Sequence, residues 1–322
     1  MIRPVAVRLG LLALLWAPGG GSAQSASDLA GQCVAASGDA TLCARVAGAG
    51  RDLAGYVGLL IAPGAELSGQ ASTLGRRLGG MPRIAASLRA GGTRVVRPSL
   101  DSVGGSEESG FVTSVQATLG LGLFDGVQVL PTVGGLFSLD VIASGALLLF
   151  SESDGFGGDG ASARAQALSI GARVGILRES FTLPAVTVSA SRRFVGDLAF
   201  GEVGSGNAAQ VLLDPGITSI RATIGKDLFA FGILAGVGWD AFSSETTARV
   251  GIGSSAFIQR TATLEESRLT YFGGVSKQIG VIAWISGEVG WTTGFDPVNV
   301  GAGASPDVGR TTFGSVALVL KL

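Results

Sequence analysis

The sequence predicts an all-β fold, an antiparallel transmembrane β-barrel of about ten strands preceded by a short helical segment. After Pro82, small or polar residues alternate with large apolar ones in stretch after stretch. A period of two is that of a β-strand, in which successive side chains point to opposite faces. Mean hydropathy is +0.48 and only 15% of residues are charged, against roughly 25% in a soluble domain.

The same chain lacks the apolar runs that a membrane-spanning helix would need. The most apolar stretch, residues 133–150, carries Asp140 in its middle, whereas a spanning helix needs about twenty predominantly apolar residues. Backbone polar groups inside a bilayer must bond one another, and a closed barrel satisfies them across its strands. The 53 glycines suit the tight turns and close-packed interior of such a barrel.

Residues 1–23 have the three parts of a secretory signal peptide. Arg3 and Arg8 give a positive start, residues 9–16 form a short apolar core, and small residues precede a cleavage site at Ala23. The alternative, an N-terminal anchor helix, would need a longer apolar run. We therefore expect an exported protein that begins near Gln24.

Residues 24–81 are predicted to be a periplasmic segment with two helices and a linker. Apolar residues recur at helical spacing in the longer helix, with Asp39 as its N-cap and Pro63 as its stop. Residues 67–81 are rich in Gly and Ser and are expected to form the linker. The apolar positions are Leu42, Val46, Leu53, Val57 and Leu60.

Cys33 and Cys43 are the only cysteines in the chain. In an oxidising compartment a pair this close is expected to form a disulfide that ties the first helix to the second. A metal or redox pair is the alternative, but the chain has no histidine and the spacing is not that of a C-x-x-C motif.

Residues 82–322 are predicted to form the barrel. Short connections alternate with longer polar ones, the pattern of periplasmic turns and external loops, and an even strand count would place both barrel ends on the periplasmic side. An additional hairpin within residues 247–263 would give twelve strands; otherwise these residues extend the flanking strands. The expected strands are residues 83–96, 110–123, 136–150, 163–177, 185–195, 217–226, 229–242, 267–278, 281–293 and 311–322.

The signal peptide, the alternation and the last strand together resemble the outer-membrane β-barrel proteins of Gram-negative bacteria. The resemblance covers about three-quarters of the chain, at the level of class, and Leu322 stands where the class usually ends in an aromatic residue. It implies an outer-membrane location, contact with membrane lipids and lipopolysaccharide, and insertion by the barrel-assembly machinery. The residues that resemble the assembly signal are Val316, Leu318, Leu320 and Leu322.

Strand phase predicts which side chains line the lumen. A charge on the lipid face near mid-membrane costs on the order of 2–4 kcal/mol, so the charged face of each strand must point inward. Both signs are present, and mutual pairing of these charges would close the lumen. The predicted lumen-lining residues are Arg89, Gln116, Asp140, Arg173, Arg193, Arg221, Asp240, Glu288 and Lys321.

The sequence does not support an enzyme. Without histidine there is no His general base, no Ser–His–Asp triad and no His-ligated metal. Residues 155–160 match G-x-G-x-x-G, but a strand follows them instead of a helix. We expect no cofactor and no nucleic-acid partner, although the acidic external loops, for example Asp154 and Asp159, could bind divalent cations.

Two main functions remain open at this stage, with a His-independent barrel hydrolase as a minor third alternative. The first is a non-enzymatic, porin-like barrel with a narrow or plugged lumen that acts as a small-solute channel. The second is a structural or adhesin-like surface-interaction barrel with a closed lumen. The helical segment could cap the periplasmic mouth or enter the lumen, and continuous polar space through the lumen would favour the channel.

Overall fold

The computed structural model describes residues 24–61, 63–76, 81–98, 100, 107–128, 134–150, 164–201, 203, 208–229, 231–252, 256–301, 303–305 and 309–322. The expected signal peptide and the loop with Asp154 and Asp159 lie outside these residues. Within the described part of the chain, no helix is long and apolar enough to cross a membrane.

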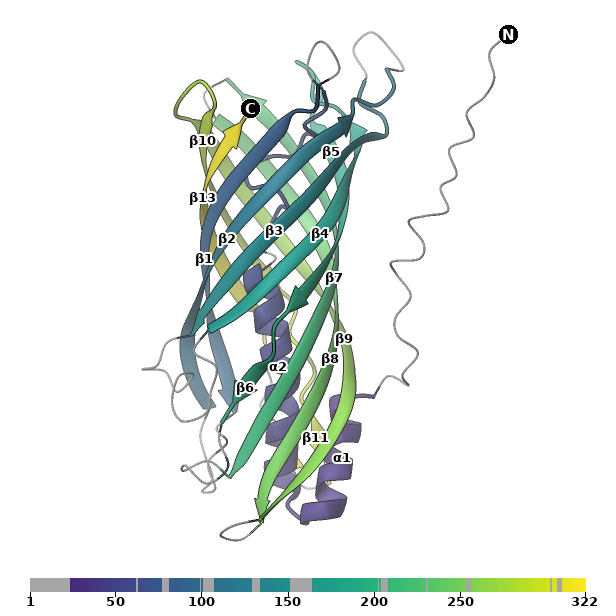
Figure 1. Ribbon diagram of the computed structural model, residues 1–322, viewed down its shortest axis with the longest axis vertical. Coiled ribbons are helices and arrows are strands. Elements are labelled where there is room, and N and C mark those ends of the chain that lie inside the picture. The colour runs from purple at the N-terminus through teal and green to yellow at the C-terminus, as the bar shows by residue number, and fades with distance from the viewer. Residues whose placement is uncertain are drawn as a thin grey trace, which may run out of the picture.

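Ten antiparallel strands close into a barrel (Figure 1). Neighbours along the chain pair with each other, β1 pairs with β13, and β5 pairs with β7. The short β6 (Leu198–Phe200) lies beside β7, and β11 (Asn299–Val300) pairs with β12 (Gly303–Ala304). The barrel strands are β1 (Ile84–Pro98), β2 (Glu107–Phe124), β3 (Ser138–Phe150), β4 (Arg164–Leu177), β5 (Ala185–Val195), β7 (Ala209–Leu228), β8 (Phe231–Ile252), β9 (Ala256–Gln278), β10 (Ala283–Thr292) and β13 (Thr311–Lys321).

The two ends of the barrel differ. We call the end with Ile84 and Leu322 proximal; the short connections β4–β5, β7–β8 and β9–β10 lie there. We call the opposite end distal, and there β7, β8 and β9 extend beyond the other strands (Figure 1). The alternative of twelve strands is not realised, because residues 247–263 lengthen β8 and β9 through continuous pairing of Gly232–Ser276 to Ile252–Ala256.

Two helices precede the barrel, as predicted. In α1 (Ala26–Ser37), Ser25 and Asp28 form a capping box. In α2 (Ala40–Ile61), the Leu42 amide donates to Asp39 Oδ1 at 2.9 Å, so Asp39 is the expected N-cap. The predicted disulfide between Cys33 and Cys43 is present and joins the two helices.

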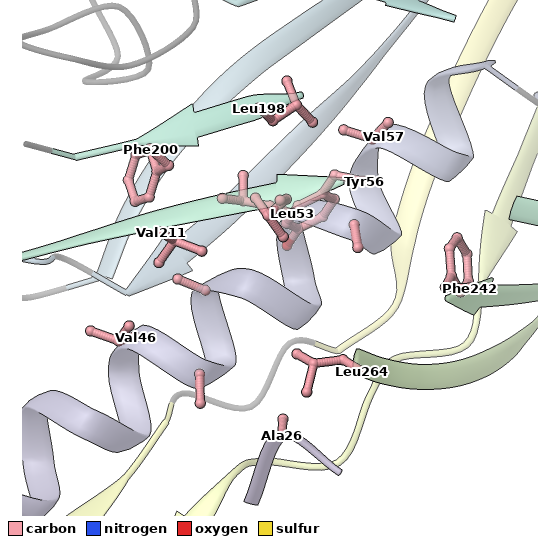
Figure 2. Close-up of a cluster of buried hydrophobic side chains, with 14 of the residues drawn as sticks. Ala26, Val46, Leu53, Tyr56, Val57, Leu198, Phe200, Val211, Phe242 and Leu264 are labelled. Atoms are coloured by element: carbon pink, nitrogen blue, oxygen red, sulfur yellow. The ribbon is translucent and has the colours of Figure 1, made fainter. Parts of the chain in front are cut away.

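α2 lies inside the distal half of the barrel, with α1 against β8 and β9 (Figure 1). Nearly every residue of α2 is buried, because strands surround the helix. Figure 2 shows Leu53 and Val57 among Leu198, Phe200 and Val211 of the wall. The distal interior is therefore an apolar core, and it includes the five apolar positions that helical spacing predicted.

The faces of the longest strands exchange character along their length. Outward positions of β8 are apolar up to Ala241 and polar or small from Ser243 to Gly251, while inward positions change from Gly238 and Asp240 to Ala248 and Val250. β7 changes in the same way. A lipid-facing wall is apolar outside, whereas a wall in water is apolar inside. The strand at residues 209–216 was not predicted, because most of its apolar residues face inward and its polar residues face outward, as in a wall surrounded by water.

Candidate functional site: the occupied lumen

The polar half of the lumen contains a stretch of chain whose larger part, from residue 67 on, was predicted to be the start of the linker. Residues 63–75 follow α2 and run through the proximal half to Arg76. We call α2 together with residues 63–75 the plug. Eight of the nine predicted lumen residues are buried on the inward faces of their strands. The ninth, Lys321, lies at the proximal end with its Nζ 4.3 Å from the centre of the Trp284 ring.

Arg89 of β1 binds the first residues of the plug after α2. Its guanidinium donates to the carbonyl oxygens of Pro63 and Ala65, the latter at 2.5 Å, and to Ser68 Oγ at 2.6 Å. Glu288 of β10 accepts the amide of Ala65 at 3.1 Å and that of Gly69 at 2.9 Å. Arg89 Nη2 and Glu288 Oε2 lie 3.6 Å apart. The wall therefore offers a donor for the carbonyl groups of the plug and, beside it, an acceptor for its amides.

Asp140 and Arg173 repeat this arrangement nearer the proximal end. Arg173 Nη2 lies 2.8 Å from Asp140 Oδ2, and both side chains are buried. Asp140 accepts the amide of Leu74, with distances of 3.1 and 3.0 Å to its two oxygens, and Arg173 donates to the carbonyl of Gln70 at 3.2 Å. The pair on the wall therefore binds the plug backbone as well as itself.

Glu66 is the acidic residue that the plug contributes to the wall. Its Oε1 accepts Ser191 Oγ at 2.8 Å and Arg193 Nη2 at 2.7 Å. Asp240 and Arg221 pair on the adjacent wall at 2.7 Å, where Thr270 also donates to Asp240.

Side chains that the sequence analysis did not single out hold α2 itself. Ser114 donates to the carbonyl of Leu60 at 2.9 Å, and Arg268 donates to the carbonyl of Gly55. The Tyr56 hydroxyl donates to the Val96 carbonyl at 2.8 Å and accepts the Val96 amide at 3.1 Å. Strand alternation puts Arg268 on the same inward face as Thr270. Nothing in the sequence indicates that it bonds a carbonyl of α2. Glu66 lies between the predicted helix stop at Pro63 and the predicted linker, and it was not among the predicted lumen residues.

A vestibule of about 460 Å³ lies at the proximal end. Its lining includes Lys226 and Lys321 of the wall and Thr73 of the plug. Three carbonyl groups already accept from Lys226, those of Ser180, Phe181 and Leu183. Residues 69–74 of the plug form part of the lining of this vestibule.

Gln116 lies in the same wall and bonds another wall residue. Its Nε2 donates to Ser144 Oγ at 3.0 Å. Within the residues that the structure describes, no cluster of acidic or cysteine side chains is suited to hold a metal ion. The described acidic residues at the distal end include Asp214 and Glu245, which face each other across β7 and β8. Divalent-cation binding stays a prediction.

The C-terminal residues that resemble an assembly signal lie on one face of the last strand. Val316, Leu318 and Leu320 alternate on the outward side of β13, and Leu322 follows it. All four side chains are exposed in the isolated chain, as lipid-facing residues are.

No protein-family model matches the sequence, and no curated protein matches it. Similar solved structures include the translocator domain of the autotransporter NalP from Neisseria meningitidis, at 15% identity and a TM-score of 0.43, over 77% of this chain and 91% of that chain.

Two further structures are an outer-membrane channel from Pseudomonas putida F1 (8% identity, TM-score 0.36, 81% of this chain and 100% of that one) and Ail from Yersinia pestis (9%, 0.26, 75% and 99%). At such low TM-scores these likenesses carry no argument about function. The prediction of a closed antiparallel β-barrel is confirmed by the ten-stranded architecture.

Proposed function

We propose that the protein is a non-enzymatic, closed outer-membrane β-barrel that acts as a surface-interaction module. The observation that carries the proposal is that wall side chains bind the plug backbone along its length. Arg89, Glu288, Asp140 and Arg173 all bond amides or carbonyls of residues 63–74. Hydrogen bonds to charged groups contribute about 1.5–3 kcal/mol each, so this plug is a resident part of the fold.

Two further features support the proposal of a closed lumen. The distal wall around α2 is apolar, so withdrawal of the helix would expose a large hydrophobic surface to water. The disulfide holds α1 to α2, and α1 packs against β8 and β9. The outward polar face of the distal extension suits a surface displayed in water.

The strand connections give the proposed orientation. Short connections face the periplasm in bacterial barrels, which supports an orientation with the proximal end in the periplasm and the distal extension outside the cell. This orientation carries α1 and Gln24 to the outside, in contrast to the periplasmic location expected for residues 24–81 from the sequence.

Surface labelling tests the orientation. We expect an epitope inserted before Gln24 of the mature chain to bind antibody on intact cells, and an epitope in the β4–β5 turn near Phe181 to bind only after permeabilisation. The reverse pattern would refute the proposed display surface.

A small-solute channel is the second candidate, favoured by the polar proximal wall and its vestibule. Conduction would then require the plug to move. The side-chain oxygens of Thr73 and Ser138 lie 2.6 Å apart, so a T73C/S138C variant offers a staple between plug and wall. Planar-bilayer recordings of the full chain should show no conductance. Conductance that the staple abolishes and reductant restores, with the wild type recorded under the same reductant, would establish the channel instead.

A further inference from the structure

Within the part of the chain that the structure describes, the distal end of β9 has one unpaired backbone edge. β8 pairs with β9 along its whole length, from Ser276 to Ala256. On the other side, β10 pairs only with residues 270–278, and Leu269 bonds Thr293. Gln24 then occupies one position, where its amide donates to the Thr263 carbonyl at 3.1 Å. Among the residues that the structure describes, no strand pairs with residues 256–262 on this side.

Strand periodicity identifies the backbone groups that point to the free side. Leu269 and Thr263 direct their carbonyls away from β8. Because the backbone direction alternates with a period of two, Thr261, Gln259 and Phe257 direct their N–H and C=O groups the same way. All three residues are exposed, Phe257 by 54%. The edge therefore offers donors and acceptors for another strand, of which the Gln259 carbonyl already accepts the Arg260 guanidinium at 2.8 Å and would exchange that bond on docking.

Natural sheets usually protect such an edge with proline, a bulge, a very short strand or a covering segment. Here the free part carries no proline, and its pairing with β8 continues without a register shift. The bond from Gln24 shows that the next position of the same edge accepts an extended chain in parallel orientation. We propose that residues 256–262 form a docking edge for an extended, acidic peptide segment of a partner protein.

The charges beside this edge select the partner. Arg249 stacks on Phe257 at 5.6 Å and bonds the side chains of Gln259 and Gln210. Arg260 bonds the Gln259 carbonyl. Neither arginine forms an ion pair with a described residue, and opposite charges across neighbouring strands are favourable. By strand alternation Arg260 shares the inner face of the sheet with Ala248, whereas Arg249 lies on the outer face and on β8. A docked strand with a carboxylate on the face of Arg260 would supply this edge arginine with an opposite charge.

Symmetry argues against a second copy of this chain in the same membrane. A two-fold axis along the membrane normal keeps both β9 strands pointing the same way across the bilayer, which excludes antiparallel pairing. Parallel pairing bonds each residue to the two neighbours of its partner residue, and therefore needs a one-residue offset that an exact two-fold axis does not give. The edge thus fits an extended peptide, which meets no such constraint.

The test uses the full chain in detergent and a fluorescent synthetic peptide that alternates Thr and Val, with Glu near both ends. A matched control peptide has the same side chains but N-methyl groups on alternate amides. Loss of several backbone hydrogen bonds should weaken binding on the order of tenfold or more. We expect saturable binding of the first peptide and weak binding of the control.

The chain offers its own matched variants. Q259P removes an amide that faces away from β8, so the β8–β9 ladder can persist, and binding should fall as it does for the methylated peptide. Q259T keeps the amide and should bind normally, while R260Q removes the edge charge and should weaken binding of the unmethylated acidic peptide. Heat-modifiability on gels verifies that each variant is folded.

Equal binding by Q259P and the wild type, or by both peptides, would overturn the docking edge. So would a chain that self-associates through this edge and binds no peptide. The inference deepens the proposed surface-interaction function, but binding in detergent does not depend on membrane orientation or conductance. Its failure and the failure of the proposed function are therefore distinguishable.

Discussion

Asp140 is the residue at which the barrel wall, its ion pair and the plug meet. D140N leaves the Arg173 guanidinium buried without its counter-charge, which is expected to lower the free energy of unfolding by about 3–5 kcal/mol. Urea unfolding in lipid vesicles, followed by tryptophan fluorescence, measures the change. Replacing both residues, as D140N with R173M, should recover part of the loss.

An exposed pair of the same kind provides the control. Arg178 and Asp125 lie 3.8 Å apart with side chains 36% and 44% exposed. Water screens such a pair, so D125N is expected to cost below about 1 kcal/mol. Equal losses for D125N and D140N would mean that burial of the wall pair does not govern its contribution.

The cap of α1 predicts a pH dependence. Hydrogen bonds from the Ser25 amide and hydroxyl lower the pKa of Asp28 below its ordinary value of 3.8. Because the folded pKa is the lower one, the cap contributes stability above about pH 4 and loses it as pH falls through the folded value. Amide exchange in α1, corrected for intrinsic rates, should therefore accelerate on acidification. The same acceleration in D28N would exclude this carboxylate as the cause.

At the scale of elements, α2 approaches the wall so closely that a glycine is required. A Cβ on Gly50 would lie 2.8 Å from Thr246 Cγ2 and 3.4 Å from Val211 Cγ1. G50A is expected to destabilise by about 1–3 kcal/mol through overpacking, despite the better helix propensity of alanine. The midpoint of the heat-dependent mobility shift measures this cost.

Gly31 in α1 is the matched control, because a Cβ there meets nothing within 4 Å. G31A should leave stability unchanged or raise it by up to about 1 kcal/mol. If G50A proved as harmless as G31A, α2 would not be packed against β7 and β8 as described.

The strands were the most predictable elements, because lipid outside and polar groups inside force a strict alternation. β5 has the predicted bounds, and β3, β4 and β10 differ from prediction by one or two residues at their ends. Prediction failed where the environment changes to water, at residues 209–216. The plug contacts were also unpredictable in detail, because backbone groups of residues 63–74 make many of them, and every residue type carries the same backbone groups.

At the scale of the whole molecule, the plug alters the charge of the lumen. The buried wall carries five arginines against three carboxylates, an excess of two positive charges: Arg89, Arg173, Arg193, Arg221 and Arg268 against Asp140, Asp240 and Glu288. Arg51 and Asp52 of the plug pair with each other at 2.8 Å, and Glu66 neutralises one wall arginine. A barrel without its plug is therefore predicted to have a cationic interior.

Deletion of residues 24–75 should accordingly yield a pore that prefers anions. The preference should be strongest in dilute salt, because the Debye length falls from about 10 Å at 0.1 M to about 3 Å at 1 M. Reversal potentials across a KCl gradient measure it, on protein whose heat-modifiability shows a folded barrel. In the barrel that lacks residues 24–75, R193E replaces a positive charge with a negative one. This change removes the excess of two positive charges and should abolish the preference for anions. Cation selectivity in the deleted barrel, or selectivity that R193E leaves unchanged, would show that the wall arginines do not control the pore.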